Sequence, residues 1–155
     1  LYNRRGLFEL GQREMERFQR FEEPLSAIML DIDHFKQVND THSHKVGDQV
    51  LRALAQRCRR ILREVDLIGR YGGEEFAILL PGTNLENACR VAERLRQEIE
   101  IMPIPTDHGP LPVTISLGVS TATPGLKELA VLLDRADTAM YQAKQAGRNR
   151  ISFVT

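Results

Sequence analysis

The stretch DLIGRYGGEEFAILLPG, residues 66–82, decides how the chain folds. Two strand-like runs, 66–71 and 76–80, flank the turn Gly72-Gly73-Glu74-Glu75, and Pro81-Gly82 closes the second run. Apolar runs joined by a short glycine-containing connection are typical of a β-hairpin. Glycine also admits positive φ and lets a ligand approach the backbone closely. We therefore predict an antiparallel hairpin with two carboxylates at its turn.

Outward from this hairpin, the apolar spacing alternates between helical and strand-like patterns. Expected helices cover 7–21, 46–62, 84 or 86 to 101, and 126–146; expected strands cover 25–30, 113–120 and 151–154; and the Pro- and Gly-bearing stretch 103–112 is expected to be a loop. Because the hairpin requires antiparallel pairing, we expect the α+β class. The predicted architecture is a mixed, largely antiparallel sheet with flanking helices and a ferredoxin-like core.

Composition limits the classes of protein that fit. The chain has 155 residues, of which 42% are apolar and 27% charged, so residues 1–155 are expected to form a single globular domain. Lys plus Arg and Asp plus Glu both total 21, which argues against nucleic acid or an anionic membrane as the main partner. Cys58 and Cys89 lack metal-ligand spacing and are expected to be reduced in the cytoplasm. Without an initiating Met, the chain is expected to be the C-terminal part of a longer regulated protein.

Further carboxylates follow the first predicted strand. Asp31 and Asp33 are two residues apart, so they lie on the same side of the strand end, and oxygen ligands of this kind suit Mg²⁺ or Mn²⁺. Alternatively, Asp33 is the N-cap of a short helix beginning at His34. Glu74 and Glu75 alone are more simply explained as a solvated hairpin tip. Asp31 and Glu74 together favour a metal site, because Mg²⁺ takes one or two carboxylates plus water and phosphates.

Several short motifs together resemble the GGDEF family of diguanylate cyclases, and the resemblance covers nearly the whole chain. They are Asp31-Ile32-Asp33-His34-Phe35-Lys36, Asn39-Asp40, His44, Gly47-Asp48, Gly72-Gly73-Glu74-Glu75-Phe76, Ala143-Lys144 and Gly147-Arg148-Asn149. The resemblance implies a signalling enzyme that condenses two GTP into cyclic di-GMP and two pyrophosphates, with Mg²⁺ or Mn²⁺ as cofactor. It also implies a homodimer, in which each domain holds one GTP, and an upstream sensory or receiver domain. Ser43 stands where the family usually has glycine.

The resemblance implies roles for individual residues. Asp31, the backbone carbonyl of Ile32, Glu74 and Glu75 are the expected metal ligands. Glu75 is also the candidate to take the proton from the attacking 3′-hydroxyl, and Lys36 the candidate to stabilise charge on the transferring phosphate. The expected GTP contacts are Phe35, Lys36, Asn39, His44, Asp48, Gly72, Gly73, Lys144 and Arg148.

Simpler interpretations exist for several of these residues. Asn39 and Asp48 can select guanine because its N1–H and N2 amino group are adjacent donors, but alone they suit a turn and the first turn of a helix. Lys144 and Arg148 also suit a helix C-terminus. The histidines of the H-x-H sequence, His42 and His44, are interpreted as polar loop residues, and no zinc is assigned.

A second site is implied by Arg63-Glu64-Val65-Asp66, which matches the family's R-x-x-D inhibitory site for cyclic di-GMP. Arg94 resembles a secondary arginine of that site, although a solvated helix face explains the same residues. Three other functions fit less of the sequence: a degenerate domain that senses GTP or cyclic di-GMP, a palm-type cyclase that acts on one nucleotide, and a non-catalytic dimerisation domain.

Overall fold

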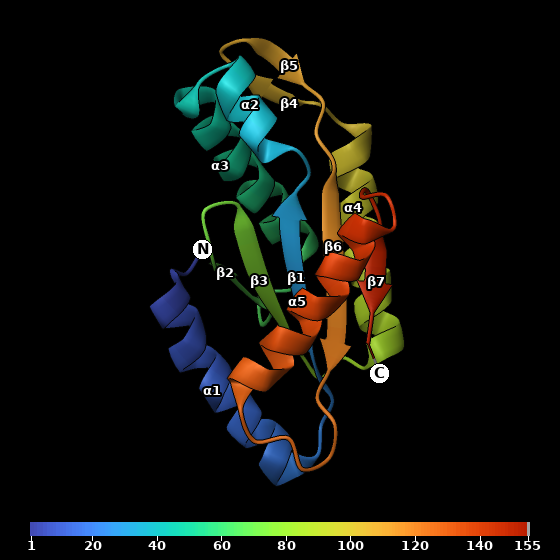
Figure 1. The fold of residues 1–155 in the computed structure, drawn as a ribbon. Coiled ribbons are helices and arrows are strands. Elements are labelled where there is room, and N and C mark those ends of the chain that lie inside the picture. The colour runs from blue at the N-terminus through green and yellow to red at the C-terminus, as the bar shows by residue number, and fades with distance from the viewer. Residues whose placement is uncertain (155) are drawn as a thin grey trace.

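The chain folds into a five-stranded sheet with helices on both faces (Figure 1). The computed structural model describes residues 1–154. In chain order the elements are α1 (Arg4–Phe21), β1 (Leu25–Ile32), α2 (Phe35–Thr41), α3 (His44–Ile61), β2 (Leu67–Arg70), β3 (Glu75–Pro81), α4 (Leu85–Ile101), β4 (Ile104–Thr106), β5 (Gly109–Leu111), β6 (Ile115–Thr121), α5 (Leu129–Gln145) and β7 (Ile151–Phe153). The predicted hairpin and the α+β class are confirmed.

The strand order of the sheet is β2-β3-β1-β6-β7, and every neighbouring pair is antiparallel except β6 and β7. The chain passes from β1 to β2 through α2 and α3, leaving room for β3 between these strands. It passes from β3 to β6 through α4, leaving room for β1. Two such split crossovers make the ferredoxin-like core that the sequence predicts.

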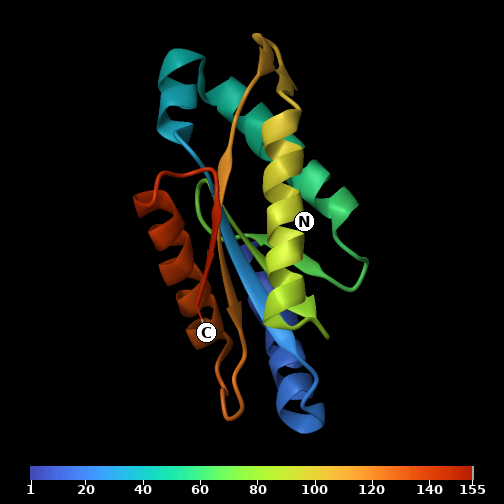
Figure 2. The same cartoon turned by 90° about the vertical axis from the view of Figure 1, so that its right-hand side faces the viewer.

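Side chains alternate between the two faces of β1 because successive residues of a strand point to opposite sides. Ile28, Leu30 and Ile32 pack with α3 and α4, whereas Ala27 and Met29 pack with α1 and α5. Figure 2 shows the sheet nearly edge-on, with α5 and α4 on opposite sides. The same alternation places Asp31 on the α5 side of the sheet.

Side-chain caps mark the beginnings of α1 and α4. Asn3 and Asn84 cap α1 and α4 by accepting hydrogen bonds from Gly6 N (2.8 Å) and Asn87 N (2.9 Å). Gly147, with a φ of 128°, follows the end of α5. Among residues 1–154, no helix has both the length and the apolar character needed to cross a bilayer.

The expectation of a loop over 103–112 is wrong. Strands β4 and β5 pair antiparallel, and the Thr106 hydroxyl closes the turn by donating to Gly109 O at 2.7 Å. Two prolines, Pro105 and Pro110, face each other in this register. Proline is tolerated because each strand of a two-stranded ribbon is an edge strand, so a missing N–H costs no interior ladder bond. Buried Ile104 anchors the hairpin to the core.

Both cysteines are free thiols, as predicted. Cys58 is buried in α3, and burial raises the pKa of its thiol to about 12. Cys89, in α4, is half-buried, and burial raises the pKa of its thiol too. Both therefore pack as small apolar side chains in their neutral form.

Candidate functional site

Adjacent strand ends bring the acidic residues together on the α5 side of the sheet. Asp31, at the end of β1, is the direct cross-strand partner of Glu75, the first residue of β3. Glu74 precedes Glu75 in the turn, and both are half-buried. Lys144, from the last turn of α5, donates a hydrogen bond to Asp31 Oδ2. The structure therefore joins residues from three separate elements into one charged cluster.

The electrostatics of this cluster favour the arrival of positive charge. Burial, followed by the nearby Asp31 carboxylate, raises the pKa of both Glu74 and Glu75. Burial also raises the pKa of Asp31, although Lys144 acts in the opposite direction. The Oδ1 atom of Asp31 is buried and accepts no hydrogen bond from residues 1–154. A buried, unsatisfied carboxylate oxygen of this kind fits a cation ligand.

The turn between β2 and β3 is fixed by the first helix. Tyr71 lies 6.1 Å from Phe8 in a stacked pair, and the Arg4 guanidinium lies 4.2 Å above the Tyr71 ring. Neither Gly72 nor Gly73 has a positive φ, so the turn does not use the conformational freedom of its glycines. A Cβ built on Gly73 meets no atom within 4 Å, so the glycine leaves its backbone open to a ligand.

The sequence suggested Asp33 as a metal ligand or as the N-cap of a short helix, and its surroundings match neither role. Its buried carboxylate accepts hydrogen bonds from Thr114 Oγ1 (2.7 Å), Ser116 Oγ (2.7 Å) and the backbone N–H of Asn149 (2.9 Å). The position before α2 is occupied by His34, with a φ of 58° and no side-chain cap. Asp33 is therefore neither an N-cap nor a free metal ligand, and it ties β6 to the turn after α5.

The side chains expected to hold guanine come from α2 and α3. Gly47 allows these helices to approach closely: a Cβ there would lie 1.9 Å from Asn39 Oδ1 and 3.1 Å from Phe35 Cζ. Asp48 follows Gly47 and is exposed. Phe35 is buried and acts as packing for α2, while Lys36 is exposed beside it. The structure thus places Asn39 against the helix that carries Asp48.

Ser43 adopts backbone angles that favour glycine, with φ 155° and ψ 166°. Such angles are unfavourable for a residue that has a Cβ. The Ser43 hydroxyl offsets part of this conformational cost by accepting a hydrogen bond from Val46 N at 3.1 Å, which caps α3. The cap leaves His44 exposed at the first position of that helix. The loop before His44 thus keeps a glycine-like shape with serine in place.

The two histidines of the H-x-H sequence separate in the structure. His42 lies against His108 of the β4–β5 hairpin, with 3.2 Å between their Nδ1 atoms. No group of three or more His, Cys, Asp or Glu residues within 1–154 is arranged to hold a metal ion. A carboxylate pair with substrate oxygens, the arrangement usual for Mg²⁺, needs no such group.

Arg63 and Asp66 form a closed pair. Asp66 is buried and accepts from the Arg63 backbone N–H and Nη2, both at 2.8 Å. Arg63 Nη2 also donates to Pro81 O at 2.7 Å and Thr83 Oγ1 at 3.1 Å. Arg94 is exposed on α4, and no hydrogen bond or ion pair within residues 1–154 links it to this pair. A ligand that used Asp66 directly would have to displace Arg63.

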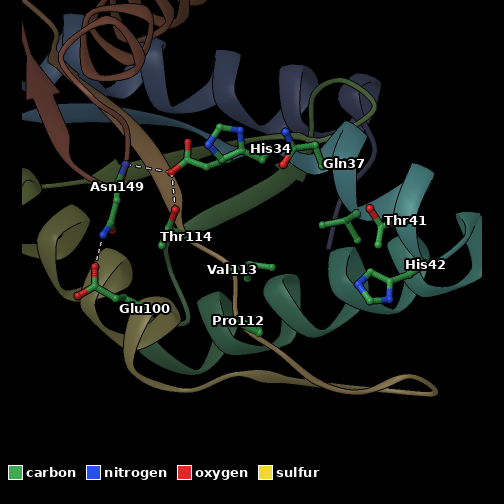
Figure 3. Close-up of a pocket in the computed structure, with 11 residues that line it drawn as sticks. His34, Gln37, Thr41, His42, Glu100, Pro112, Val113, Thr114 and Asn149 are labelled. Carbon is green, nitrogen blue, oxygen red and sulfur yellow. Dashed lines mark hydrogen bonds between the residues drawn. The ribbon is translucent and has the colours of Figure 1, made fainter.

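A pocket of about 580 Å³ lies between α2, the end of α4 and the segment before β6 (Figure 3). Its wall includes His34, Gln37 and Thr41, which follow one another at helical spacing. None of the sequence-predicted GTP-binding residues lines it. The predicted GTP contacts lie instead on α2, α3, the Gly72-Gly73 turn, and the end of α5 with the turn that follows it.

Several residues that shape the site were missed in the sequence. Thr114 and Ser116, which hold Asp33, belong to a strand that alternates apolar with small polar residues, and that alternation was a usable signal. Arg96 bonds to Asn149 across 53 positions. Its helical spacing from Glu93 and Glu100 indicated an ion-pair cluster but not the contact with Asn149.

Known proteins resemble this chain in both sequence and fold. Residues 1–150 match the family described as diguanylate cyclase, GGDEF domain. The response regulator PleD of Caulobacter vibrioides is 44% identical over 153 residues, which cover 97% of this chain and 34% of PleD. This chain therefore spans about a third of that curated relative.

Solved structures agree with this match. The active GGEEF domain of a diguanylate cyclase from Vibrio cholerae has a TM-score of 0.94 at 37% identity, covering 100% of this chain and 98% of that one. The GGDEF domain of DgcB from Caulobacter crescentus, in complex with c-di-GMP, has a TM-score of 0.93 at 31% identity, covering 99% and 88%. The chain belongs to the GGDEF family of diguanylate cyclase domains.

Proposed function

We propose that this domain is a diguanylate cyclase, which condenses two GTP into cyclic di-GMP and two pyrophosphates. The observation that carries the proposal is the meeting of Asp31, Glu74 and Glu75 at adjacent strand ends, with Asp31 Oδ1 buried and without a hydrogen-bond partner in residues 1–154. The Vibrio cholerae domain described as active carries GGEEF, the same signature as Gly72–Phe76. Glutamate at position 74 is therefore compatible with activity.

We propose Mg²⁺ or Mn²⁺ as the cofactor, held by Asp31, the carbonyl of Ile32, Glu74 and Glu75. The unsatisfied oxygen of Asp31 and a ligand set made only of oxygen atoms fit such an ion. When bound, the ion supplies positive charge to the phosphates of GTP. Lys144 donates one hydrogen bond to Asp31 Oδ2 in this structure, and the other N–H groups of its ammonium can donate to a phosphate.

Other residues of the chain are proposed to accept the proton, to contact the phosphates and to recognise guanine. Glu75 is the proposed acceptor of the 3′-hydroxyl proton, and it lies half-buried at the start of β3, opposite Asp31. Lys36, Lys144 and Arg148 are the proposed phosphate contacts. Asp48, from α3, would accept hydrogen bonds from the N1–H and N2 amino group of guanine, assisted by the amide of Asn39 from α2. His44 and the Gly72-Gly73 backbone would lie close to the nucleotide.

Two copies of the domain are needed, because each holds one GTP and each 3′-hydroxyl attacks the α-phosphate held by the other. PleD is a response regulator, and we propose that an upstream sensory or receiver domain controls the meeting of the two copies here too. The test is incubation of the domain with GTP and Mg²⁺ at increasing protein concentration. Cyclic di-GMP formation that rises with roughly the square of dilute domain concentration supports the proposal. Bound GTP without product at high concentration would instead support a sensor.

Gly47→Ala is expected to weaken guanine recognition. The new Cβ would lie 1.9 Å from Asn39 Oδ1, so the amide must move from its place against α3. We expect the KM for GTP to rise about tenfold, the cost of one misplaced hydrogen-bonding group, with the melting temperature little changed because a short flexible side chain gives way. Ala53→Gly, farther along α3, is the control for exchanging alanine and glycine in this helix. A KM for GTP that is unchanged in Gly47→Ala would contradict the placement of Asn39.

We also propose feedback inhibition by cyclic di-GMP at Arg63, Asp66 and Arg94. The exposed cations are Arg63, whose side chain is 55% exposed, and Arg94, whereas Asp66 is buried and holds Arg63 in place. Arg63→Ala is expected to remove product inhibition and to leave the initial rate unchanged. Initial rates measured with added cyclic di-GMP test this, and inhibition as strong as in the wild type would refute it.

A further inference from the structure

The turn after α5 holds three consecutive residues at positive φ. The values are 128° at Gly147, 65° at Arg148 and 48° at Asn149. The first half of the turn is a Schellman ending, in which Arg148 N donates to Ala143 O (3.1 Å) and Gly147 N to Lys144 O (3.3 Å). A left-handed backbone is unfavourable for residues with a Cβ and persists where the surroundings hold it.

Asn149 is held from two directions. Its backbone N–H donates to Asp33 Oδ2 at 2.9 Å, so the end of β1 fixes the chain directly after Arg148. Its side-chain Oδ1 accepts from Arg96 Nη1 at 3.0 Å, and its Nδ2 donates to Glu100. Figure 3 shows the Asn149 side chain pointing toward Glu100. We call Asn149, Arg96 and Glu100 the Asn149 clamp.

The α4 side of the clamp is itself rigid. The Arg96 side chain is only 15% exposed and donates to Glu93 Oε1 at 2.6 Å and to Glu100 Oε2 at 3.0 Å. The hydrogen bond from Arg96, followed by burial acting in the opposite direction, leaves the pKa of Glu93 below its ordinary value. An arginine with several charge-assisted partners has little freedom left, so it presents a fixed donor to Asn149.

We propose that Asn149, through this clamp, is a positioning residue that aims Arg148 at the outer phosphates of GTP; this inference rests on the proposed function. The Arg148 side chain is exposed. The Schellman bonds fix the backbone before it, while the Asp33 bond holds the backbone of Asn149 and the clamp holds its side chain after it. Fixing the backbone before the nucleotide arrives removes an ordering cost from binding. The clamp does not touch the nucleotide and acts only through Arg148.

Two variants open the clamp from opposite ends. Arg96→Ala removes the donor on α4, and Asn149→Gly removes the side-chain bonds while keeping a residue that accepts positive φ. Both are expected to weaken binding of Mg²⁺-GTP about tenfold, the effect of losing one charge-assisted phosphate contact, and to leave GMP binding unchanged. Arg90→Ala is the matched control, because Arg90 makes a similar ion pair with Glu86 on the same helix, exposed and away from the turn.

A double-mutant cycle separates positioning from simple loss of stability. In an Arg148→Ala background, opening the clamp should have no further effect on GTP affinity, because the residue through which it acts is gone. Equal loss of GTP and GMP affinity, or an undiminished effect in that background, would overturn the proposal. Cyclic di-GMP synthesis is assayed separately, so a domain that binds GTP in the predicted way but makes no product refutes the proposed function and leaves the clamp standing.

Discussion

Asp31→Asn is expected to lower the rate of cyclic di-GMP synthesis about a thousandfold, the loss typical when a group that stabilises transition-state charge is removed. The domain should nevertheless stay folded. Folding raises the pKa of Asp31, chiefly by burial, so the ionised carboxylate costs stability at neutral pH and asparagine removes that cost. Lys144 loses its partner but is partly exposed and can be solvated.

Rates and thermal unfolding measured on the same preparation check this prediction. We expect the free energy of unfolding to change by less than about 1 kcal/mol, or to rise, since burial disfavours the ionised form of Asp31 by more than Lys144 favours it, and asparagine carries no charge. Asp134→Asn, at an exposed position of α5, is the control for loss of one negative charge. Activity within tenfold of the wild type would remove Asp31 from the proposed metal site.

Gly118→Ala is expected to unfold the domain or to lower its free energy of unfolding by more than about 4 kcal/mol, beyond the usual range for one substitution. A Cβ at Gly118 would lie 2.0 Å from Ala136 O and 2.1 Å from Met140 N, which are backbone atoms of α5. No rotamer change relieves such a contact. Helix α5 would have to move away from β6, and it carries Lys144 as well as much of one core layer.

Thermal or urea unfolding of purified Gly118→Ala protein measures this effect. Gly73→Ala is the control for stability, because its Cβ would meet no atom within 4 Å and the backbone there does not need positive φ. The control should unfold within about 0.5 kcal/mol of the wild type, as substitutions outside packed regions usually do. A Gly118→Ala protein as stable as this control would show that α5 packs less closely on β6 than in this structure.

Local patterns were sufficient for most of the fold. The helices α3 and α4 follow from apolar stripes, and the β2–β3 hairpin follows from glycine between two apolar runs. The sequence failed at 103–112, where Pro105 and Pro110 suggested a loop. There the pairing of two edge strands and the burial of Ile104, neither of which is a local property, outweigh the low strand propensity of proline.

The sequence by itself determined which residues are candidates for chemistry, because carboxylates, glycines and cations at family spacing are visible without coordinates. Only the tertiary structure decided what each one contacts. It places Asp31 opposite Glu75 and in an ion pair with Lys144. The Asp33 carboxylate accepts hydrogen bonds from Ser116 and Asn149, and Arg63 forms an ion pair with Asp66. The physical reason is that hydrogen bonds and ion pairs depend on distances between residues as many as 116 positions apart, which strand order and helix packing set.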